Sequence, residues 1–516
     1  MRMRRTTAAV RLALALSLAA GAASAAQPTF KDADTRAWWA ITSHLSSDAM
    51  EGRDTGSPGH VRAARWVAER FAAAGLKPAG TAGYLQPIAL HEVKVELEGT
   101  AISVWRGDRS AKPLRFLHQI SVRATEALPA TLAAPMSFRG YCSKAEMGAD
   151  MRGKIAICFG GRRKGVPGGG ERVEAAAAAG AVGLISIDDP GFTIEPARWP
   201  DAYARSVGFK GAPPPAHADL PVMRASDAAF EILLEGSGRS AADILKLGAA
   251  SQPLPSFDVP ATLHANFRLS TRDYTSDNVL GLLPGTDPAL AHEVIVVSAH
   301  LDGYGFGELV GGDGLYNGAF DDAAYVATLI RLAEGRAGKG FRRPVLSAAF
   351  TGEEKGLLGA TAFTRAPTVP KSDLAADINL DQLRPLFPLK ILAVHAVDDT
   401  TLGDAVRSVA AARGIEVRKD MEPERGLVQR ADHWPFLKVG VPATGFVFGY
   451  DSRTEAERRS REWYQTRYHR PQDDLGQPFK PEAARDFNAF FYALTQAVAD
   501  GDKRPVFKAG SALALK

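Results

Sequence analysis

Short, continuously apolar runs alternate with longer amphipathic stretches through the second half of the chain. Apolar runs of this length are typical of strands that are buried on both faces of a sheet. The predicted strands occupy 294–299, 345–350, 377–380 and 390–397. The predicted helices between and after them occupy 321–334, 355–364 and 401–413. Because strands and helices alternate, we expect an α/β fold whose mixed, mostly parallel sheet is covered by helices.

The hydrophobic pattern is different in the first half of the chain. Helical spacing predicts two helices near the N-terminus, at 37–45 and 60–74. From about residue 129, short strand-like runs surround a glycine-rich segment and an alanine-rich helix, and proline clusters mark the turns. The predicted domains are a larger, discontinuous one at 26–128 and 263–516 and an inserted, small α+β, β-rich one at 129–262.

The first 25 residues have the three parts of an export signal. Arginines come first, an apolar stretch follows at 12–20, and Ala23-Ser24-Ala25 is a small-residue cleavage site. Removal of residues 1–25 would take away four arginines and no acid, so the formal net charge of +4 would fall to zero. We therefore expect a periplasmic or extracellular location and no nucleic-acid partner. No later apolar segment is long enough to span a bilayer, so we expect no transmembrane segment in the mature chain.

Cys142 and Cys158 are the only cysteines of the chain. An oxidising compartment would allow a disulfide between them. Cys158 also ends a strand-like apolar run, where a buried free thiol fits the sequence equally well, so the pairing stays open. The absence of a paired-cysteine motif argues against a zinc site built from thiolates.

Ionisable residues follow the predicted strands, at the points where each strand ends. His300 and Asp302 follow the first strand, Glu353 and Glu354 follow the second, and Asp381 follows the third. In open α/β sheets, ligands collect beyond the carboxyl ends of the strands, so we expect these side chains to converge. Imidazole and carboxylate groups suit zinc, and two metal ions about 3.5–4 Å apart can clamp both oxygens of a reacting carbonyl group. The sequence therefore predicts a two-metal hydrolase.

Five motifs around these residues resemble, in this order, the zinc metallopeptidases of family M28, of the co-catalytic two-zinc aminopeptidase type. They are Ser298-Ala-His-Leu-Asp302, Gly318-Ala-Phe-Asp-Asp322, Phe350-Thr-Gly-Glu-Glu354, Ile378-Asn-Leu-Asp381 and Tyr468-His-Arg-Pro-Gln-Asp473. The resemblance covers most of 34–125 and 263–500, and the region between resembles the protease-associated (PA) domain that is often inserted in this family. It implies a zinc exopeptidase-like fold, two Zn²⁺ ions as cofactors and peptides as substrates.

The resemblance also implies a role for each site residue. The implied metal ligands are His300, Asp321, Glu354, Asp381 and His469, with Asp321 as the carboxylate that bridges the two ions. Asp302 would orient His300 by accepting a hydrogen bond from the second ring nitrogen. A metal-bridging hydroxide would be the nucleophile. Glu353 would be the general base, which takes a proton from the metal-bound water and passes it to the leaving amine.

The loop at 318–325 departs from the family pattern, which usually reads Gly-Ala-Asp-Asp-Asn-Ala-Ser-Gly. Phe320 replaces the first aspartate, and Ala324-Tyr325 replace Ser-Gly. The register makes Asp321 the bridging residue and leaves Asp322 as the alternative. The tyrosine that stabilises the oxyanion in relatives has no counterpart that the sequence identifies here.

These inferences predict an exported metallo-exopeptidase that removes N-terminal residues from peptides. A carboxypeptidase or another amidohydrolase on the same core is the alternative, because Arg384, Arg425 and Arg430 lie near the site motifs and could bind a carboxylate. A catalytically inactive binding protein or receptor is disfavoured, since every expected ligand and the base are present. The motif Asp432-His433 either lines the pocket or has a structural role. The sequence leaves the side-chain preference, the oligomeric state and the native divalent ion open, since similar ligands accept several ions.

Overall fold

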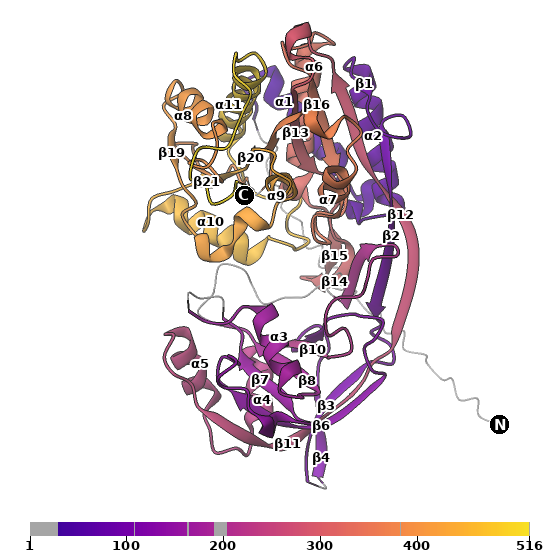
Figure 1. Ribbon diagram of the computed structural model, residues 1–516, viewed down its shortest axis with the longest axis vertical. Coiled ribbons are helices and arrows are strands. Elements are labelled where there is room, and N and C mark those ends of the chain that lie inside the picture. The colour runs from indigo at the N-terminus through magenta and orange to yellow at the C-terminus, as the bar shows by residue number, and fades with distance from the viewer. Residues whose placement is uncertain (1–28, 108, 162–164, 190–203, 382, 515–516) are drawn as a thin grey trace, which may run out of the picture.

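The computed structural model describes residues 29–107, 109–161, 165–189, 204–381 and 383–514. It has two lobes, and long strands connect them along one side (Figure 1). The expected export signal at residues 1–25 lies outside the described residues. Within the described ranges, no helix combines the length and the apolarity that crossing a membrane requires.

The larger lobe is built on a mixed sheet. Its strands are β1 (Lys77–Pro78), β2 (Leu85–Val95), β9 (Arg205–Phe209), β12 (Leu269–Leu283), β13 (Val294–His300), β16 (Val345–Phe350), β17 (Leu374–Asn379) and β20 (Ala443–Thr444). They lie in the order β20-β17-β13-β16-β12-β2-β9, and β1 pairs with β12. β13, β16 and β17 are buried at every position and pair in parallel, in agreement with their mostly apolar sequences. β12 and β2 extend the sheet with antiparallel pairs, so the α/β class with a mixed sheet is confirmed.

Helices cover both faces of this sheet. They are α1 (Ala33–Leu45), α2 (Pro58–Ala73), α6 (Ala324–Arg336), α7 (Leu358–Arg365), α8 (Leu402–Ala411), α9 (His433–Lys438), α10 (Glu455–Thr466) and α11 (Pro481–Ala499). Ile295 and Val297 of β13 pack into one apolar core with α1, α2, α6 and α11, whereas Val294 and Val296 pack into another with α7 and α9. A smaller sheet beside α8 consists of β18 (Ile391–Val394), β19 (Glu416–Arg418) and β21 (Phe446–Gly449).

Local sequence explains where some of the helices begin. Asp32 caps α1 and Ser57 caps α2, and each side chain accepts a main-chain hydrogen bond that contributes about 1 kcal/mol. The helix predicted at 321–334 begins only at Ala324, because Asp321 and Asp322 have non-helical backbone angles. The predicted start of that helix at residue 321 was therefore wrong. Asp321 and Asp322 lie before the helix, and their carboxylates make contacts in the site described below.

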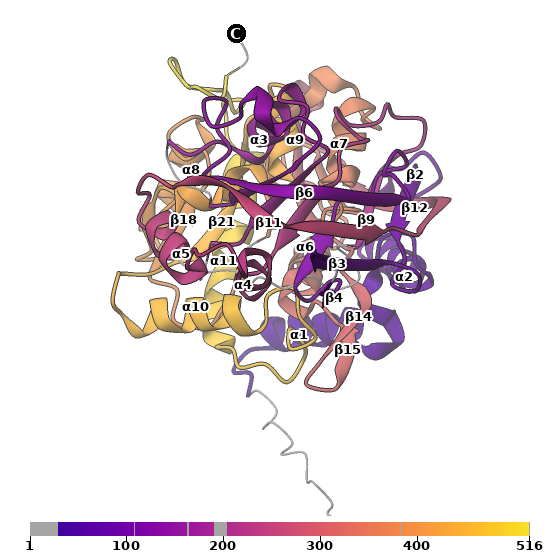
Figure 2. The same cartoon turned by 90° about the horizontal axis from the view of Figure 1, so that it is seen from below.

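The smaller lobe has its own mixed sheet and its own apolar core. Its strands are β3 (Ala101–Arg106), β4 (Arg109–Leu114), β5 (Ile120–Val122), β6 (Thr131–Arg139), β7 (Ile155–Phe159), β8 (Gly183–Ile187), β10 (Val222–Ala225) and β11 (Ser256–Asn266). They lie in the order β4-β3-β11-β6-β7-β8-β10-β5, and Figure 2 shows β6 beside β11 across this lobe. Its helices are α3 (Gly169–Ala178), α4 (Asp227–Leu234) and α5 (Ala241–Ala249). The predicted domain boundaries at 129 and 262 stay a prediction. The strands β3 and β4 precede residue 129 in the chain and nevertheless pair within this sheet.

A disulfide in the smaller lobe joins Cys142 to Cys158 of β7. Both residues are fully buried, in an apolar cluster that also contains Met151 and Leu184. Of the two alternatives that the sequence left open, the paired form is therefore the one found in the structure.

Several contacts connect the two lobes. β9 comes from the chain segment between β8 and β10, but it pairs with β2 of the larger sheet. A hairpin made of β14 (Gly305–Val310) and β15 (Asp313–Tyr316) lies between the lobes (Figure 1). His118 of the smaller lobe contacts Glu308 of this hairpin at 2.9 Å. The hairpin follows His300 and Asp302 in the chain, so a contact between the lobes borders the predicted site.

Candidate metal centre

Each residue predicted as a metal ligand lies at a strand end or in a loop beside the parallel strands. His300 is the last residue of β13, and Glu354 follows β16. Asp381 follows β17, Asp321 lies in the turn before α6, and His469 lies in the loop after α10. Their side chains converge into overlapping groups of potential ligand atoms, as expected at the carboxyl ends of strands in an open sheet.

Asp321 lies between the two histidines. Its Oδ1 is 3.4 Å from Nε2 of His300, and its Oδ2 is 3.5 Å from Nε2 of His469. Nε2 of His469 also lies 3.3 Å from Oε2 of Glu354. A carboxylate that faces two imidazoles with different oxygens has the arrangement that a bridging ligand needs.

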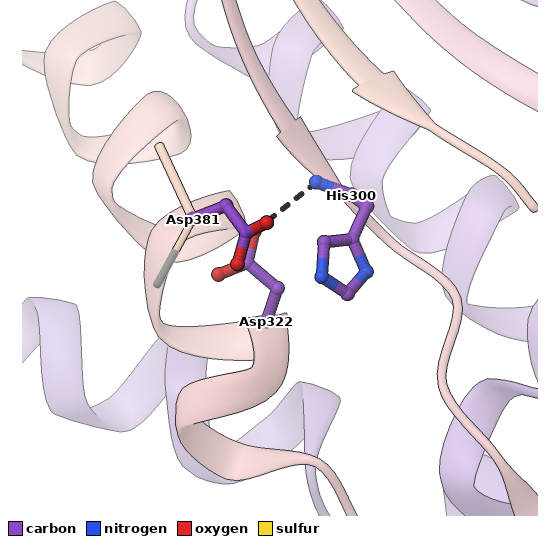
Figure 3. A group of neighbouring side chains, drawn as sticks. All are labelled: His300, Asp322 and Asp381. Atoms are coloured by element: carbon purple, nitrogen blue, oxygen red, sulfur yellow. Dashed lines mark hydrogen bonds between the residues drawn. The ribbon is translucent and has the colours of Figure 1, made fainter. Parts of the chain in front are cut away.

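Asp322 and Asp381 form a second group with His300 (Figure 3). One potential ligand atom of each residue lies within 4.8 Å of the others. Oδ2 of Asp322 accepts a hydrogen bond from the main-chain N–H of His300 at 3.1 Å, which is the dashed line in Figure 3. Asp322 therefore contacts the backbone of His300, whereas Asp321 contacts its imidazole ring.

The pKa values separate the two neighbouring aspartates. Burial alone would raise the pKa of Asp321, but Arg384, His300 and His469 outweigh this effect and hold the pKa below its ordinary value. Burial dominates at Asp322 and raises the pKa well above its ordinary value, and neighbouring aspartates add to the rise. These opposite shifts reflect the different surroundings of the two carboxylates, and the choice of Asp321 over Asp322 as the bridging ligand stays a prediction.

Several potential ligand atoms at this centre are buried and have no hydrogen-bond partner among the described residues. They are Nε2 of His300, Oδ2 of Asp321 and Oε1 of Glu354. Buried polar atoms of folded proteins are nearly always hydrogen-bonded, so atoms left in this state point to a group that binds there. Imidazole nitrogens and carboxylate oxygens are donor atoms that zinc accepts, and the residues present therefore fit a divalent metal ion.

Glu353 belongs to a third group of potential ligand atoms, together with His300 and Glu354. Burial raises the pKa of Glu353 well above its ordinary value. His300 opposes this rise, whereas Asp381 and Glu354 add to it. A carboxylate whose pKa is raised can accept a proton and hold it for a later transfer, which is the property that a general base and acid requires.

Asp302 contacts His300 through a different atom from the one expected. Nδ1 of His300 lies 3.0 Å from the main-chain carbonyl oxygen of Asp302 and 3.8 Å from Oδ1 of its carboxylate. The carboxylate instead accepts hydrogen bonds from the hydroxyl of Thr55 at 3.0 Å and from the main-chain N–H of Glu353 at 3.1 Å. Asp302 therefore contacts His300 mainly through its carbonyl oxygen, and its role as the residue that orients His300 stays a prediction.

The loop that carries Asp321 is held by hydrogen bonds from a buried arginine to main-chain carbonyl groups. The guanidinium of the fully buried Arg53 donates to the carbonyl oxygens of Leu45, Leu301, Asn317 and Gly318, at 2.6–2.8 Å. Gly318 has a φ of 60°, and a Cβ atom there would lie 2.4 Å from the carbonyl oxygen of Asp321. Glycine is therefore required at this turn.

Arg384 and Asp473 hold the same loop at Phe320. Nη1 of Arg384 donates to the carbonyl oxygen of Phe320 at 2.9 Å, and Nη2 lies 3.4 Å from Oδ2 of Asp321. Oδ1 of Asp473 accepts from the main-chain N–H of Phe320 at 3.0 Å. The ring of Phe320 packs against the tryptophans of α1, so the core accommodates the departure from the family pattern at this position.

Two tyrosines surround His469. The hydroxyl of Tyr304 lies 3.1 Å from Nδ1 of His469, and the ring of Tyr468 stacks on the imidazole with 3.6 Å between centroids. Arg430 donates to the hydroxyl of Tyr468 at 3.0 Å. Sequence reasoning missed Tyr304, and its place two residues after Asp302, in the loop that follows β13, was the available signal.

Comparisons with known proteins agree with this geometry. Residues 278–495 match peptidase family M28, and residues 125–231 match the PA domain. The chain carries an M28 peptidase domain and a PA domain. The resemblance drawn from the motifs is thereby confirmed, together with the expectation of an enzyme of this peptidase family. No curated protein matches the chain.

Solved structures with a similar fold extend over both the M28 domain and the PA domain. An aminopeptidase from Aneurinibacillus sp. has a TM-score of 0.61 at 17% identity, over 90% of this chain and 93% of that chain. A zinc aminopeptidase from Bacillus subtilis has a TM-score of 0.56 at 18% identity, over 92% of this chain and 97% of that chain. An M28 peptidase precursor from Shewanella amazonensis has a TM-score of 0.52 at 16% identity, over 91% of this chain and 98% of that chain. At this level of identity the likeness shows a shared fold.

Proposed function

We propose that the chain is a two-zinc aminopeptidase, which removes N-terminal residues from peptides. The observation that carries this proposal is that the predicted ligands lie close together. Several of their own buried ligand atoms have no hydrogen-bond partner among the described residues. The match to family M28 and the zinc aminopeptidase among the similar folds support the same conclusion.

Five residues hold the metals in this proposal. Asp321 would be held in common by the two ions, Glu354 and His469 would bind one of them, and His300 and Asp381 would bind the other. Zinc ions bound there supply a Lewis acid for the scissile carbonyl and lower the pKa of water toward about 7. The same ligands also accept other divalent ions, so zinc is proposed on the strength of the donor set and the similar folds.

Glu353 carries the proton in the proposed reaction. Its buried carboxylate takes the proton that the attacking water loses and then delivers it to the amine that leaves. Asp302 supports this role, because it accepts a hydrogen bond from the main-chain N–H of Glu353. That bond keeps the start of the Glu353 segment beside the end of β13, where the ligands converge.

The arginines that favoured a carboxypeptidase have other partners in the structure. Arg384 donates to the carbonyl oxygen of Phe320, and Arg430 donates to the hydroxyl of Tyr468. Arg425 pairs with Glu422 at 3.0 Å and lies over the ring of Tyr464. Because these guanidinium groups are engaged within the fold, they give little support to a pocket for a substrate carboxylate.

We also propose that the protein is exported. The disulfide between Cys142 and Cys158 supports this, since such bonds persist in oxidising compartments. N-terminal sequencing of the mature protein checks the proposal, with a start at Ala26 as the expected result. A mature chain that begins at Met1 would contradict it.

Enzyme assays with matched substrates test the proposed function. Purified protein should hydrolyse leucine p-nitroanilide, lose this activity with a chelator and regain it with zinc. N-acetyl-leucine p-nitroanilide and C-terminally exposed, N-blocked peptides should remain intact. Release of C-terminal residues from N-blocked peptides would establish a carboxypeptidase instead, and protein that binds no zinc would contradict the metal centre.

A further inference from the structure

Asp432 is a buried carboxylate beside the metal centre that the proposed reaction has not yet used. It directly precedes α9 and is 1% exposed, and neither of its carboxylate oxygens has a hydrogen-bond partner among the described residues. The next residue, His433, lies against the end of β17, because its Nδ1 is 3.4 Å from Oδ1 of Asn379. Asp381 is two residues farther along that segment. Asp432 is therefore at the same edge of the sheet as the proposed ligands.

The charges that act on Asp432 belong to the metal centre. Burial raises the pKa of Asp432 well above its ordinary value, His300 opposes this rise, and Asp302 and Asp381 add to it. Asp432 in turn contributes to the raised pKa of Glu353. Because such effects weaken with distance, Asp432 lies within electrostatic reach of the proposed base and of the proposed ligands.

Asp377 provides a comparison from the same region. Asp377 is fully buried, and the charge of Asp432 contributes to the raised pKa of Asp377. In contrast to Asp432, its Oδ1 accepts a hydrogen bond from the hydroxyl of Ser298 at 2.8 Å. None of the described residues donates a hydrogen bond to Asp432. Burial of a carboxylate without a donor or a counter-ion is costly, so a structural role alone does not account for Asp432.

An aminopeptidase substrate supplies a cation in the region where Asp432 needs one. Its α-ammonium nitrogen is two covalent bonds from the scissile carbonyl carbon, a separation of about 2.5 Å. When the carbonyl lies between Glu353 and the ligands, the ammonium group is in the same small region. Asp302, Glu353 and Asp432 are acids in addition to the carboxylates proposed as ligands, and a cation bound among them would favour their ionised forms.

We propose that Asp432 recognises the free α-ammonium group of the substrate and thereby selects peptides whose N-terminus is unblocked. This inference rests on the proposed aminopeptidase function and deepens it. An N-acylated peptide presents an uncharged amide at the same place, which would leave the carboxylate without its counter-ion. Asp432 is therefore a specificity-determining residue in addition to the metal ligands and the base.

The variant Asp432→Asn tests the proposal, because it keeps the size of the side chain and removes its charge. Two pairs of probes differ only in the amine. One pair is leucine p-nitroanilide and 4-methylpentanoyl p-nitroanilide, and the other is 1-amino-3-methylbutylboronic acid and 3-methylbutylboronic acid. The loss of the ion pair should lower kcat/KM for the amino substrate and the affinity for the aminoboronic acid by about 100-fold. The two probes without an amine should change by less than about threefold, because they do not contact this residue.

Asp377→Asn is the matched control, since it removes a buried charge from a carboxylate that already has a donor. It should change both members of each pair by the same factor. An equal loss with both members in Asp432→Asn would overturn the inference, because Asp432 would then act on the metals or on Glu353. If Asp432→Asn does not fold, Asp432→Ser with the same boronic acids gives the same comparison. If the wild-type protein hydrolyses no aminoacyl substrate, the proposed function itself is contradicted. If the wild type is active and Asp432→Asn loses both members of each pair equally, only the role of Asp432 is contradicted.

Discussion

The larger and the smaller lobe each contain parallel strands with acidic residues near their carboxyl ends, but the two strand edges differ in chemistry. Asp188 follows β8 of the smaller lobe and forms an ion pair with Arg224 of the neighbouring strand β10. In the larger lobe, Glu354 and His300 follow neighbouring strands, and each has a buried atom without a hydrogen-bond partner among the described residues. Arg224 thus gives the acid of the smaller lobe a counter-charge, whereas Glu354 and His300 lie beside other potential metal ligands.

This difference shows that a position at a strand end does not by itself make a metal centre. The rule for open sheets places ligands at the carboxyl ends of strands, but a metal centre also needs several potential ligand atoms close to one another there. Among the described residues, the groups of histidine and carboxylate able to hold a metal ion all lie in the larger lobe. The grouped carboxylates are therefore the residues to change in experiments.

Removal of the bridging carboxylate should have the largest effect. Asp321→Asn should lower the zinc content and reduce kcat about 10⁴-fold, because a bound metal pair contributes several kcal/mol to the stabilisation of the transition state. Metal analysis and steady-state kinetics check this expectation. Asp188→Asn in the smaller lobe is the control and should retain both zinc and activity. Loss of zinc in Asp322→Asn with retention in Asp321→Asn would transfer the bridging role to Asp322.

Neutralisation of the proposed base should separate chemistry from metal binding. Glu353→Gln should retain zinc but lose about 10³-fold in kcat, because a positioned proton carrier contributes 10²–10⁴-fold. The binding of a boronic acid inhibitor, measured by calorimetry, should persist in this variant. Full activity of Glu353→Gln would rule out the proposed mechanism.

Loss of the disulfide should affect the smaller lobe alone. Cys142 and Cys158 are 16 positions apart, and removal of a crosslink that closes a loop of this size costs about 3 kcal/mol. The double variant Cys142→Ser, Cys158→Ser should therefore unfold at lower urea concentration, as followed by circular dichroism. Its zinc content and its kcat below the transition should match those of the wild type. A parallel loss of zinc would show that the two lobes depend on each other more closely than this comparison implies.

The buried histidines of the larger lobe should make it sensitive to acid. Burial and the nearby charge of Arg425 together lower the pKa of His395 from the ordinary 6.5 to about 4, and burial is the larger cause. Below about pH 6.5 the unfolded chain therefore binds a proton that the folded chain refuses, and stability falls as the pH drops toward 4, by about 2 kcal/mol at pH 5. His395→Gln should remove this part of the pH dependence when zinc-free protein is unfolded in urea at pH 7 and pH 5. An unchanged difference between the two pH values would contradict a neutral, buried His395.

The strands that carry the centre could be predicted because β13, β16 and β17 are mostly apolar, which is typical of strands that are buried on both faces. The motifs also placed His300 and Glu354 at the ends of these strands, where the structure has them. The roles of the individual ligands stay a prediction that metal analysis can test. The start of α6 was mispredicted, because Asp321 and Asp322 leave the helical conformation to reach their partners.

Contacts between distant main-chain atoms could not be predicted. The carbonyl oxygen of Asp302 lies nearer to the ring of His300 than its carboxylate does, and the carboxylate accepts from Thr55 and from the N–H of Glu353. No motif reports which carbonyl groups a buried arginine such as Arg53 will meet. The sequence also could not predict that the carboxylate of Asp432 has no hydrogen-bond partner among the described residues. Which groups surround a buried aspartate depends on the folded chain.

The hydrogen bonds of Arg53 have a consequence for any attempt to isolate the peptidase segment. Arg53 precedes Leu301 by 248 positions and Gly318 by 265 positions in the chain. The segment that matches family M28 begins only at residue 278, so a fragment cut there would keep every proposed ligand but lose the donor that satisfies these carbonyl groups. The smallest autonomous unit of this protein must therefore include residues from before the PA domain, and a graft of the downstream half into another protein would need that upstream segment supplied with it.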